Sequence, residues 1–162
     1  MKKILIPLLL LSVFVVVLMF SSCNRCTGNF PHSHGGLCWS DKTPDAMTWE
    51  DAITYCKNLG GRLPTLSELR TLIQNCPATQ TGGACGVTDS CLSWNDCRDS
   101  SCDGCSSDSS GKYSVFGDAG WFWSSSVPSE YTDLAWFVNF LNGNVSLNYR
   151  DYFYGVRCVG VE

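Results

Sequence analysis

The sequence has 162 residues, eleven cysteines and a formal net charge of −4. This length predicts one domain with additional segments. Because the charge is acidic and no basic run follows the N-terminal segment, the composition argues against nucleic acid as a partner.

Residues 1–22 predict a signal peptide that does not belong to the fold. Two lysines precede an uncharged apolar run over residues 4–20, and small residues follow, which is typical of a secretory signal. Phe20-Ser21-Ser22-Cys23 resembles a bacterial lipobox, in which the cysteine receives lipid and becomes the mature N-terminus. We therefore expect lipidation at Cys23 and attachment to a membrane through the lipid. Simple cleavage, or retention of the segment as an anchor, are the alternatives.

The remaining cysteines predict disulfides. If Cys23 carries lipid, eleven minus one leaves ten, and an even number behind an export signal indicates pairing because thiols oxidise outside the cytosol. The predicted location is the cell envelope, at the outer membrane or cell surface.

Residues 23–44 are interpreted as an N-terminal linker or loop because glycines and prolines interrupt them. Cys26 and Cys38 are expected to form a local disulfide. Zinc binding by these cysteines with His32 and His34 is the alternative, but histidines two residues apart do not have the spacing of a zinc finger.

Two helices are predicted next. Thr48 is a suitable N-cap for a helix that ends before Gly60-Gly61, with apolar residues on one face. Thr65 and Glu68 form a capping box for a second helix, which is expected to reach Cys76.

Residues 76–112 are interpreted as a cysteine-rich insertion, because small polar residues dominate and apolar residues are too few for a core. Its six cysteines allow 15 pairings; they are Cys76, Cys85, Cys91, Cys97, Cys102 and Cys105. Cys102 to Cys105 has the CxxC form, but the surrounding serines and glycines favour structural disulfides over redox catalysis.

Strands are predicted from Gly120 onward. Residues 134–141 are apolar and aromatic, Asn142-Gly143 indicates a two-residue hairpin turn, and alternating apolar residues follow. In residues 134–141, Trp136 lies on one face and Phe137 on the other. Helices that precede strands indicate an α+β fold.

The sequence resembles the Lcl C-terminal domain family over about residues 39–162. The motifs that carry the resemblance are Trp49-Glu50-Asp51-Ala52, Tyr55-Cys56, Leu59-Gly60-Gly61-Arg62-Leu63-Pro64-Thr65, Glu68-Leu69, Trp123-Ser124-Ser125-Ser126, Ala135-Trp136-Phe137-Val138, Phe140 with Gly143, and Val156-Arg157-Cys158-Val159. The resemblance implies a C-type-lectin-like domain over residues 45–162, with two helices packed on a small antiparallel sheet and the long disulfide-rich loop inserted. It also implies a disulfide between Cys56 and Cys158.

The resemblance implies binding rather than catalysis, since the best-known member of the family acts in adhesion to sulfated polysaccharides. We expect a non-catalytic, lipid-anchored surface module for glycan or protein ligands. The alternatives are an enzyme similar to formylglycine-generating enzymes and a purely structural envelope protein. The predicted ligand-binding residues are Trp136, Tyr149, Arg150 and Tyr152, because aromatic and arginine side chains are favoured contact residues.

No cofactor is expected apart from a possible calcium ion. Asp96, Asp99 and Asp103 are the candidate ligands, because calcium prefers oxygen atoms held by a constrained backbone. The triplet Trp94-Asn95-Asp96 resembles the calcium and sugar motif of lectins, but it precedes the strands instead of lying among the last ones. A solvated acidic loop is the alternative interpretation.

Overall fold

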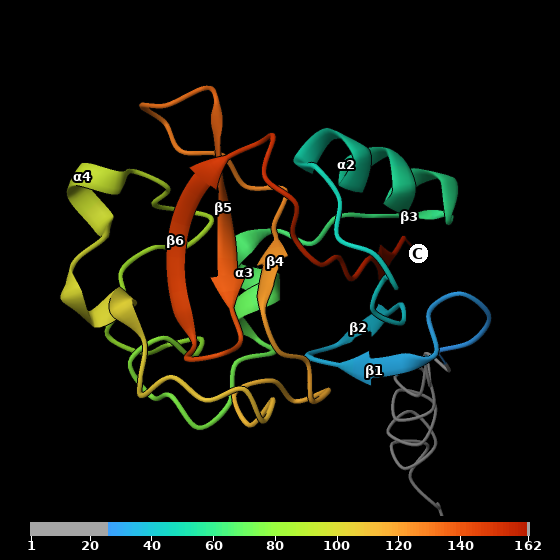
Figure 1. Cartoon of the computed structure of the whole chain (residues 1–162), viewed down its shortest axis with the longest axis horizontal. Coiled ribbons are helices and arrows are strands. Elements are labelled where there is room, and N and C mark those ends of the chain that lie inside the picture. Colours follow the sequence, from blue (N-terminus) through green and yellow to red (C-terminus); the bar gives the residue numbers. More distant parts are fainter. Residues whose placement is uncertain (1–25, 162) are drawn as a thin grey trace, which may run out of the picture.

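The computed structural model describes residues 26–161, which form an α+β fold with two antiparallel sheets (Figure 1). The sheets have the strand orders β1-β2-β7-β3 and β4-β5-β6. The elements are β1 (His32–His34), β2 (Leu37–Trp39), α2 (Trp49–Asn58), β3 (Gly61–Arg62), α3 (Leu66–Arg70), α4 (Trp94–Cys97), the 3-10 helix η3 (Ser100–Asp103), β4 (Trp121–Trp123), β5 (Leu134–Asn139), β6 (Asn144–Tyr149) and β7 (Val159–Gly160). The predicted α+β class is confirmed, and the lectin-like arrangement stays a prediction.

Helix α2 begins where its capping residue predicts. The Thr48 hydroxyl accepts a hydrogen bond from the backbone N–H of Asp51 at 3.3 Å, which satisfies one of the free donors of the first turn. Ala52 and Cys56 are fully buried on the inner face of the helix. The helix therefore packs its cysteine against the core.

Helix α3 has the predicted capping box but is shorter than predicted. The Thr65 hydroxyl accepts from the N–H of Glu68, and the Glu68 carboxylate accepts from the N–H of Thr65. The helix ends at Arg70 because the following residues pair with another segment. The N–H of Gln74 donates to the carbonyl of Tyr113, and Ile73 forms an isolated bridge with Ser114.

Strand β5 is covered on both faces. Trp136 and Val138 pack with α3 and the cysteine-rich loop in one hydrophobic cluster. Ala135 and Phe137 pack with α2 and the C-terminal segment in a second cluster. The hairpin pairs Asn139 with Asn144, so residues 140–143 form a four-residue turn instead of the predicted two-residue turn.

The interpretation of residues 23–44 as a linker is wrong for the described part of that segment. Strands β1 and β2 lie in the same sheet as the last strand, and Trp39 of β2 is fully buried opposite Val159. The N–H of Ser40 donates to the carbonyl of Cys158 at 2.9 Å. These pairings, which bring the beginning and end of the described chain together, cannot be read from residues 23–44 alone.

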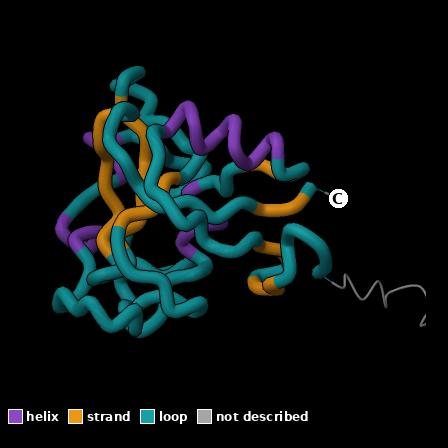
Figure 2. The backbone as a smooth tube through the Cα atoms, turned by 45° about the vertical axis from the view of Figure 1, so that its right-hand side comes forward, coloured by secondary structure: helices purple, strands orange, loops and turns teal. Residues whose placement is uncertain are grey.

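Disulfides occur both in the helix–sheet frame, which is the described chain outside residues 76–112, and in the cysteine-rich loop. Cys56 pairs with Cys158, as the family resemblance implies, and Cys26 pairs with Cys38. In the loop, which is mostly without regular structure (Figure 2), the pairs are Cys76–Cys105, Cys85–Cys102 and Cys91–Cys97. Five disulfides are consistent with an extracellular or exported protein.

The predicted signal peptide and Cys23 lie outside the described residues. Between residues 26 and 161, the helices are too short and too polar to span a membrane.

Candidate ligand-binding site

A surface groove forms where three segments distant in the sequence meet. They are the connection between β2 and α2, the start of β4, and the segment that follows β6 (Figure 1). Isolated bridges join Met47 to Tyr154 and Phe122 to Gly155, which fixes the last segment between the other two. The groove has a volume of about 330 Å³, which lies within the usual range for small-ligand sites.

Two exposed aromatic side chains line this groove. Trp121 is 45% exposed and Phe153 is 66% exposed, whereas Phe122 beneath them is 1% exposed. Lys42 and Pro44 line the same groove. We call this feature the aromatic groove.

Tyr154 supports the aromatic groove from within. Its ring stacks on Trp121 with centroids 6.0 Å apart, and it packs against Trp123 with centroids 4.4 Å apart. The amide of Asn148 donates to the Tyr154 hydroxyl oxygen. Burial raises the pKa of Tyr154, so the side chain stays neutral at ordinary pH. Trp121 is therefore exposed on a firmly packed base.

A second hollow is lined in part by residues that come just before groove-lining residues in the sequence. Its lining includes three carboxylates, from Glu50, Asp133 and Asp151, and one guanidinium, from Arg150. We call it the acidic hollow. Only Tyr152 separates residues 149–151, which line the acidic hollow, from residues 153–155, which line the aromatic groove.

Arg150, a predicted ligand-binding residue, already has partners within the protein. Its guanidinium carbon lies 4.2 Å from the ring centroid of Trp49, and its Nε atom donates to the carbonyl of Leu134 at 3.1 Å. The backbone carbonyl of Arg150 also accepts from the N–H of Trp49. Arg150 thus ties the start of α2 to the end of β6 while it lines the acidic hollow.

The other predicted ligand-binding residues differ in exposure. Tyr149 and Tyr152 are 55% and 52% exposed. Trp136 is fully buried, and its selection as a ligand-binding residue is wrong. Its indole stacks on Trp94 and donates to the carbonyl of Leu92 at 3.2 Å, because the cysteine-rich loop covers this face of β5.

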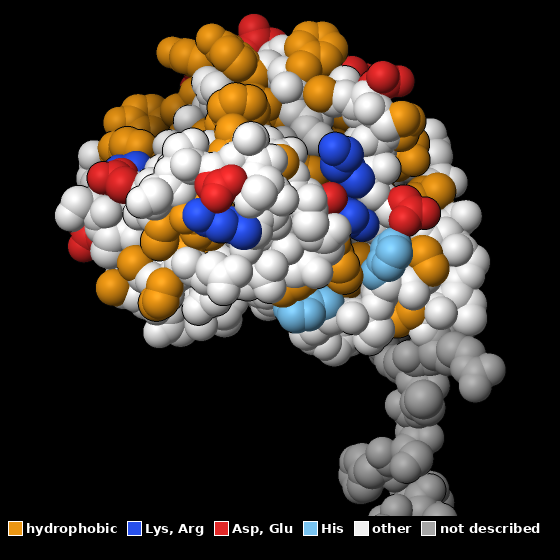
Figure 3. Space-filling view, turned by 60° about the horizontal axis from the view of Figure 1, so that its bottom comes forward, with side chains coloured by type: hydrophobic (Ala, Val, Ile, Leu, Met, Phe, Trp, Pro, Cys, Tyr) orange, Lys and Arg blue, Asp and Glu red, His pale blue; other side chains and the backbone are white. Residues whose placement is uncertain are grey.

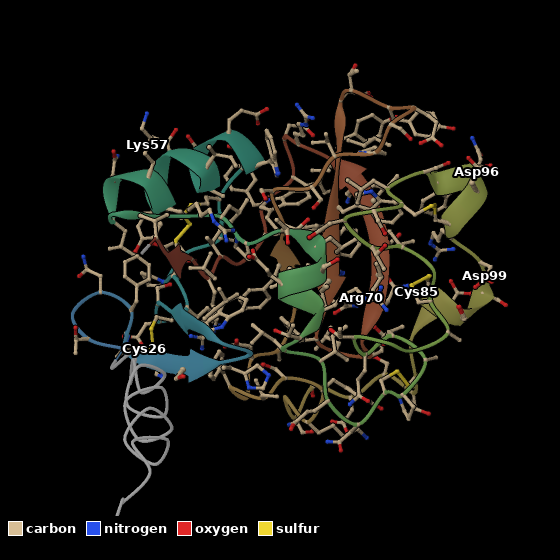
Figure 4. The ribbon with its side chains drawn as sticks, turned by 180° about the vertical axis from the view of Figure 1, so that it is seen from behind. Cys26, Lys57, Arg70, Cys85, Asp96 and Asp99 are labelled. Atoms are coloured by element: carbon tan, nitrogen blue, oxygen red, sulfur yellow. A yellow bond between two sulfur atoms is a disulfide. The ribbon has the colours of Figure 1, made fainter. Side chains whose placement is uncertain are left out.

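The predicted calcium ligands do not form a site. Within residues 26–161, no three His, Cys, Asp or Glu side chains gather as a metal site would require. Asp96 belongs to the cap of α4, Asp99 caps η3, and Asp103 pairs with Arg98 at 2.5 Å. Figure 4 shows Asp96 and Asp99 at the outer edge of the molecule. The candidates are separate because each carboxylate serves its own local turn or ion pair.

The cysteines of the CxxC sequence do not pair with each other. Cys102 bonds to Cys85 and Cys105 to Cys76, so both bonds cross-link separate parts of the cysteine-rich loop. In the N-terminal segment, Cys38 bonds to Cys26, which removes the thiolates that zinc would need.

The sequence reasoning missed Trp121 and Phe153. Phe153 lies between Tyr152 and Tyr154, and neighbouring residues of an extended chain point to opposite sides. Three consecutive aromatic residues therefore require at least one exposed ring unless both sides are covered. This signal was available in the sequence, although it does not specify which ring is exposed.

Residues 29–160 match the family model described as the Lcl C-terminal domain. The match spans both sheets, the helices and the cysteine-rich loop. No curated protein matches the sequence.

Proposed function

Because the chain belongs to the Lcl C-terminal domain family, we propose that it is an exported, non-catalytic binding module that holds its ligand in the aromatic groove. The observation that carries this proposal is the pair of exposed rings, Trp121 and Phe153, in one groove. Large apolar side chains that gather at a surface mark interaction sites, and aromatic rings contribute strongly to binding.

The rigidity of the surrounding frame supports the proposal. The disulfide between Cys56 and Cys158 joins α2 to the C-terminal segment just after the groove, and β4 pairs with both β5 and Gly155. A ligand that meets a preorganised surface loses less free energy to the ordering of side chains and loops.

The pairing of the cysteines favours binding over the enzyme alternative. All ten cysteines of residues 26–161 take part in the five disulfides. Chemistry similar to that of formylglycine-generating enzymes requires reactive thiols, and only a thiolate acts as nucleophile or metal ligand.

We also propose that lipid on Cys23 attaches the module to the outer membrane or cell surface. The lipobox-like Phe20-Ser21-Ser22-Cys23 supports this anchor. Mass spectrometry of the N-terminal peptide is expected to find an acylated Cys23, and Cys23→Ser is expected to release the protein from membranes. An unmodified N-terminus at another residue would contradict the anchor without affecting the groove.

A binding screen tests the groove. The exported protein is applied to immobilised oligosaccharides and to purified extracellular proteins, with Trp121→Ala and Phe153→Ala as variants. Each variant is expected to weaken binding by about tenfold or more, because the ligand would cover these rings and aromatic contacts covered in this way contribute strongly to affinity. Tyr55→Ala is the matched control, because Tyr55 is an exposed aromatic on α2 outside the groove lining.

Equal loss in all three variants, or no loss in the groove variants, would contradict the proposed site. Failure of the folded protein to bind any ligand would favour the purely structural alternative.

A further inference from the structure

The distribution of charged side chains limits which classes of ligand the aromatic groove can bind. We infer that the aromatic groove takes an uncharged sugar chain, and this inference rests on the proposed function of the groove.

The basic side chains of the domain are mostly occupied. Eleven lysines and arginines, less Lys2, Lys3 and Arg25, leave eight in residues 26–161. Four of them form ion pairs, which are Arg62–Glu68, Arg98–Asp103, Lys112–Asp108 and Arg157–Asp118. Figure 3 shows the basic side chains of one face in small separate patches beside acidic ones.

Of the other four cations, two already have partners within the protein. Arg70 is 2% exposed and donates to backbone carbonyls of the loop, and Arg150 lies over Trp49. Lys57 lies on the outer side of α2 (Figure 4), away from the groove lining. Lys42 is therefore the one cation among the described residues that lines the aromatic groove.

A sulfated or otherwise polyanionic ligand does not fit this arrangement. Fifteen acidic residues less Glu162 leave fourteen in residues 26–161, so the net charge of this part is eight minus fourteen, or −6. The acidic hollow adds Glu50, Asp133 and Asp151, and its lining residues 149–151 are separated in the sequence by one residue from groove residues 153–155. A polyanion needs several cations along its path, and carboxylates of the same sign repel it.

The edge of β4 also disfavours an extended peptide. Peptides that join a sheet use free backbone groups of an edge strand. In the groove, the N–H of Gly155 donates to the carbonyl of Trp121, and the N–H of Trp123 donates to the carbonyl of Gly155. Because β5 pairs with the other edge, β4 has no free edge for a peptide strand.

A sugar ring suits the remaining features. A pyranose presents C–H groups on its faces and hydroxyls around its rim, so its face can stack on an aromatic ring. Trp121, Phe153 and Pro44 supply apolar surface in the groove, and the Lys42 ammonium supplies hydrogen-bond donors for hydroxyl groups. The volume of about 330 Å³ is limited, so one or two sugar units are expected to make most of the contacts.

The test compares neutral and sulfated chains on the exported protein. The neutral probes are glucose, mannose, xylose and N-acetylglucosamine oligomers, the sulfated probe is heparin, and a proline-rich peptide represents a protein ligand. We expect at least one neutral oligomer to bind, with an affinity that changes less than about twofold between about 50 and 500 mM NaCl, because no ion pair would be screened.

The variants connect that binding to the groove. Phe153→Ala and Trp121→Ala are expected to weaken binding of the neutral oligomer by about tenfold or more. Lys42→Gln removes the positive charge but keeps an N–H donor for sugar hydroxyls, so the affinity should change by less than about threefold. Phe153 is the more exposed of the two rings, so its variant keeps the test valid if Trp121→Ala fails to fold. Circular dichroism checks the fold, and Tyr55→Ala is the control.

Two outcomes would overturn the inference and leave the proposed function standing. They are groove-dependent binding of heparin that weakens with salt, and groove-dependent binding of the peptide without binding of any neutral oligomer. Absence of all groove-dependent binding would overturn both.

Discussion

The helix–sheet frame and the cysteine-rich loop become ordered by different means. In the frame, α2 and α3 begin at threonine caps, and both faces of β5 are buried. In the loop, residues 76–112, the regular elements are only the four-residue α4 and η3, and three disulfides cross-link its turns. Local signals and apolar burial order the frame, whereas the loop, which adds Val87, Leu92 and Trp94 to the same core, relies on cross-links for most of its order.

Arg70 connects the two regions. It lies on α3, and its guanidinium donates to the carbonyls of Thr79 at 2.9 Å, Gln80 at 3.1 Å and Val87. A buried charge without carboxylate partners is costly unless hydrogen bonds satisfy it. Burial lowers the pKa of Arg70, and the three carbonyls hold the charged group in place. A loop with few apolar residues therefore gains an anchor from the frame.

The largest effect is expected when the frame loses its long-range disulfide. Cys56 and Cys158 are 102 residues apart, so the bond restricts the unfolded chain strongly. Their joint replacement by alanine should lower the free energy of unfolding by about 4–5 kcal/mol. Cys91 and Cys97 are 6 residues apart, and the same replacement there should cost about 2 kcal/mol.

Urea unfolding of both double variants measures this contrast. Equal destabilisation by the two replacements would contradict the expectation that the length of the closed loop sets the size of the stability loss. Alanine is preferred to serine for the first pair because Cys56 and Cys158 are fully buried and a hydroxyl would lack a partner.

A smaller loss of stability is expected when Arg70, which anchors the loop, is replaced. Arg70→Met keeps an apolar stem but leaves three carbonyls without their donor, so the free energy of unfolding should fall by about 3 kcal/mol. Amide hydrogen exchange should accelerate in residues 79–87 more than in β5. Lys57→Met, which replaces an exposed lysine, is the control. Uniform acceleration in both regions would contradict a local role for Arg70.

The same contrast explains which parts of the fold could be predicted. The beginnings of α2 and α3 follow from Thr48 and Thr65, because capping depends on residues three positions away. Strands β1 and β2 have three residues each and depend on Val159 at the far end of the chain. No local pattern contains that pairing.

The exposure of the aromatic residues at the site could not be predicted from local sequence either. Trp136 and Trp121 both occur in aromatic runs, and the sequence gives no reason to expect different exposure. Trp136 is buried because Leu92 and Trp94 of the loop cover it, and the position of these residues depends on the disulfides. Tyr149 and Tyr152 were predicted because tyrosine is a favoured contact residue near a turn, and they are exposed where β6 ends at Tyr149.

The smallest loss of stability is expected when the pH-dependent contacts of Glu68 in the frame are removed. Burial alone would raise the pKa of Glu68, but hydrogen bonds from Arg62 and from the N–H of Thr65 outweigh it and hold the pKa below the ordinary 4.5. A lowered pKa in the folded state adds stability above the unfolded value, and this stability is lost as the pH falls through the folded value.

Glu68→Gln should therefore lower the free energy of unfolding by about 1 kcal/mol at about pH 6, and the difference from the natural protein should shrink toward about pH 3. Thr65→Ala is the matched control, since its hydroxyl accepts from the N–H of Glu68 and does not titrate in this range. Its effect should persist at both pH values. A Glu68→Gln deficit that stays constant down to about pH 3 would mean that the shape of the side chain, and not its charge, supports the start of α3.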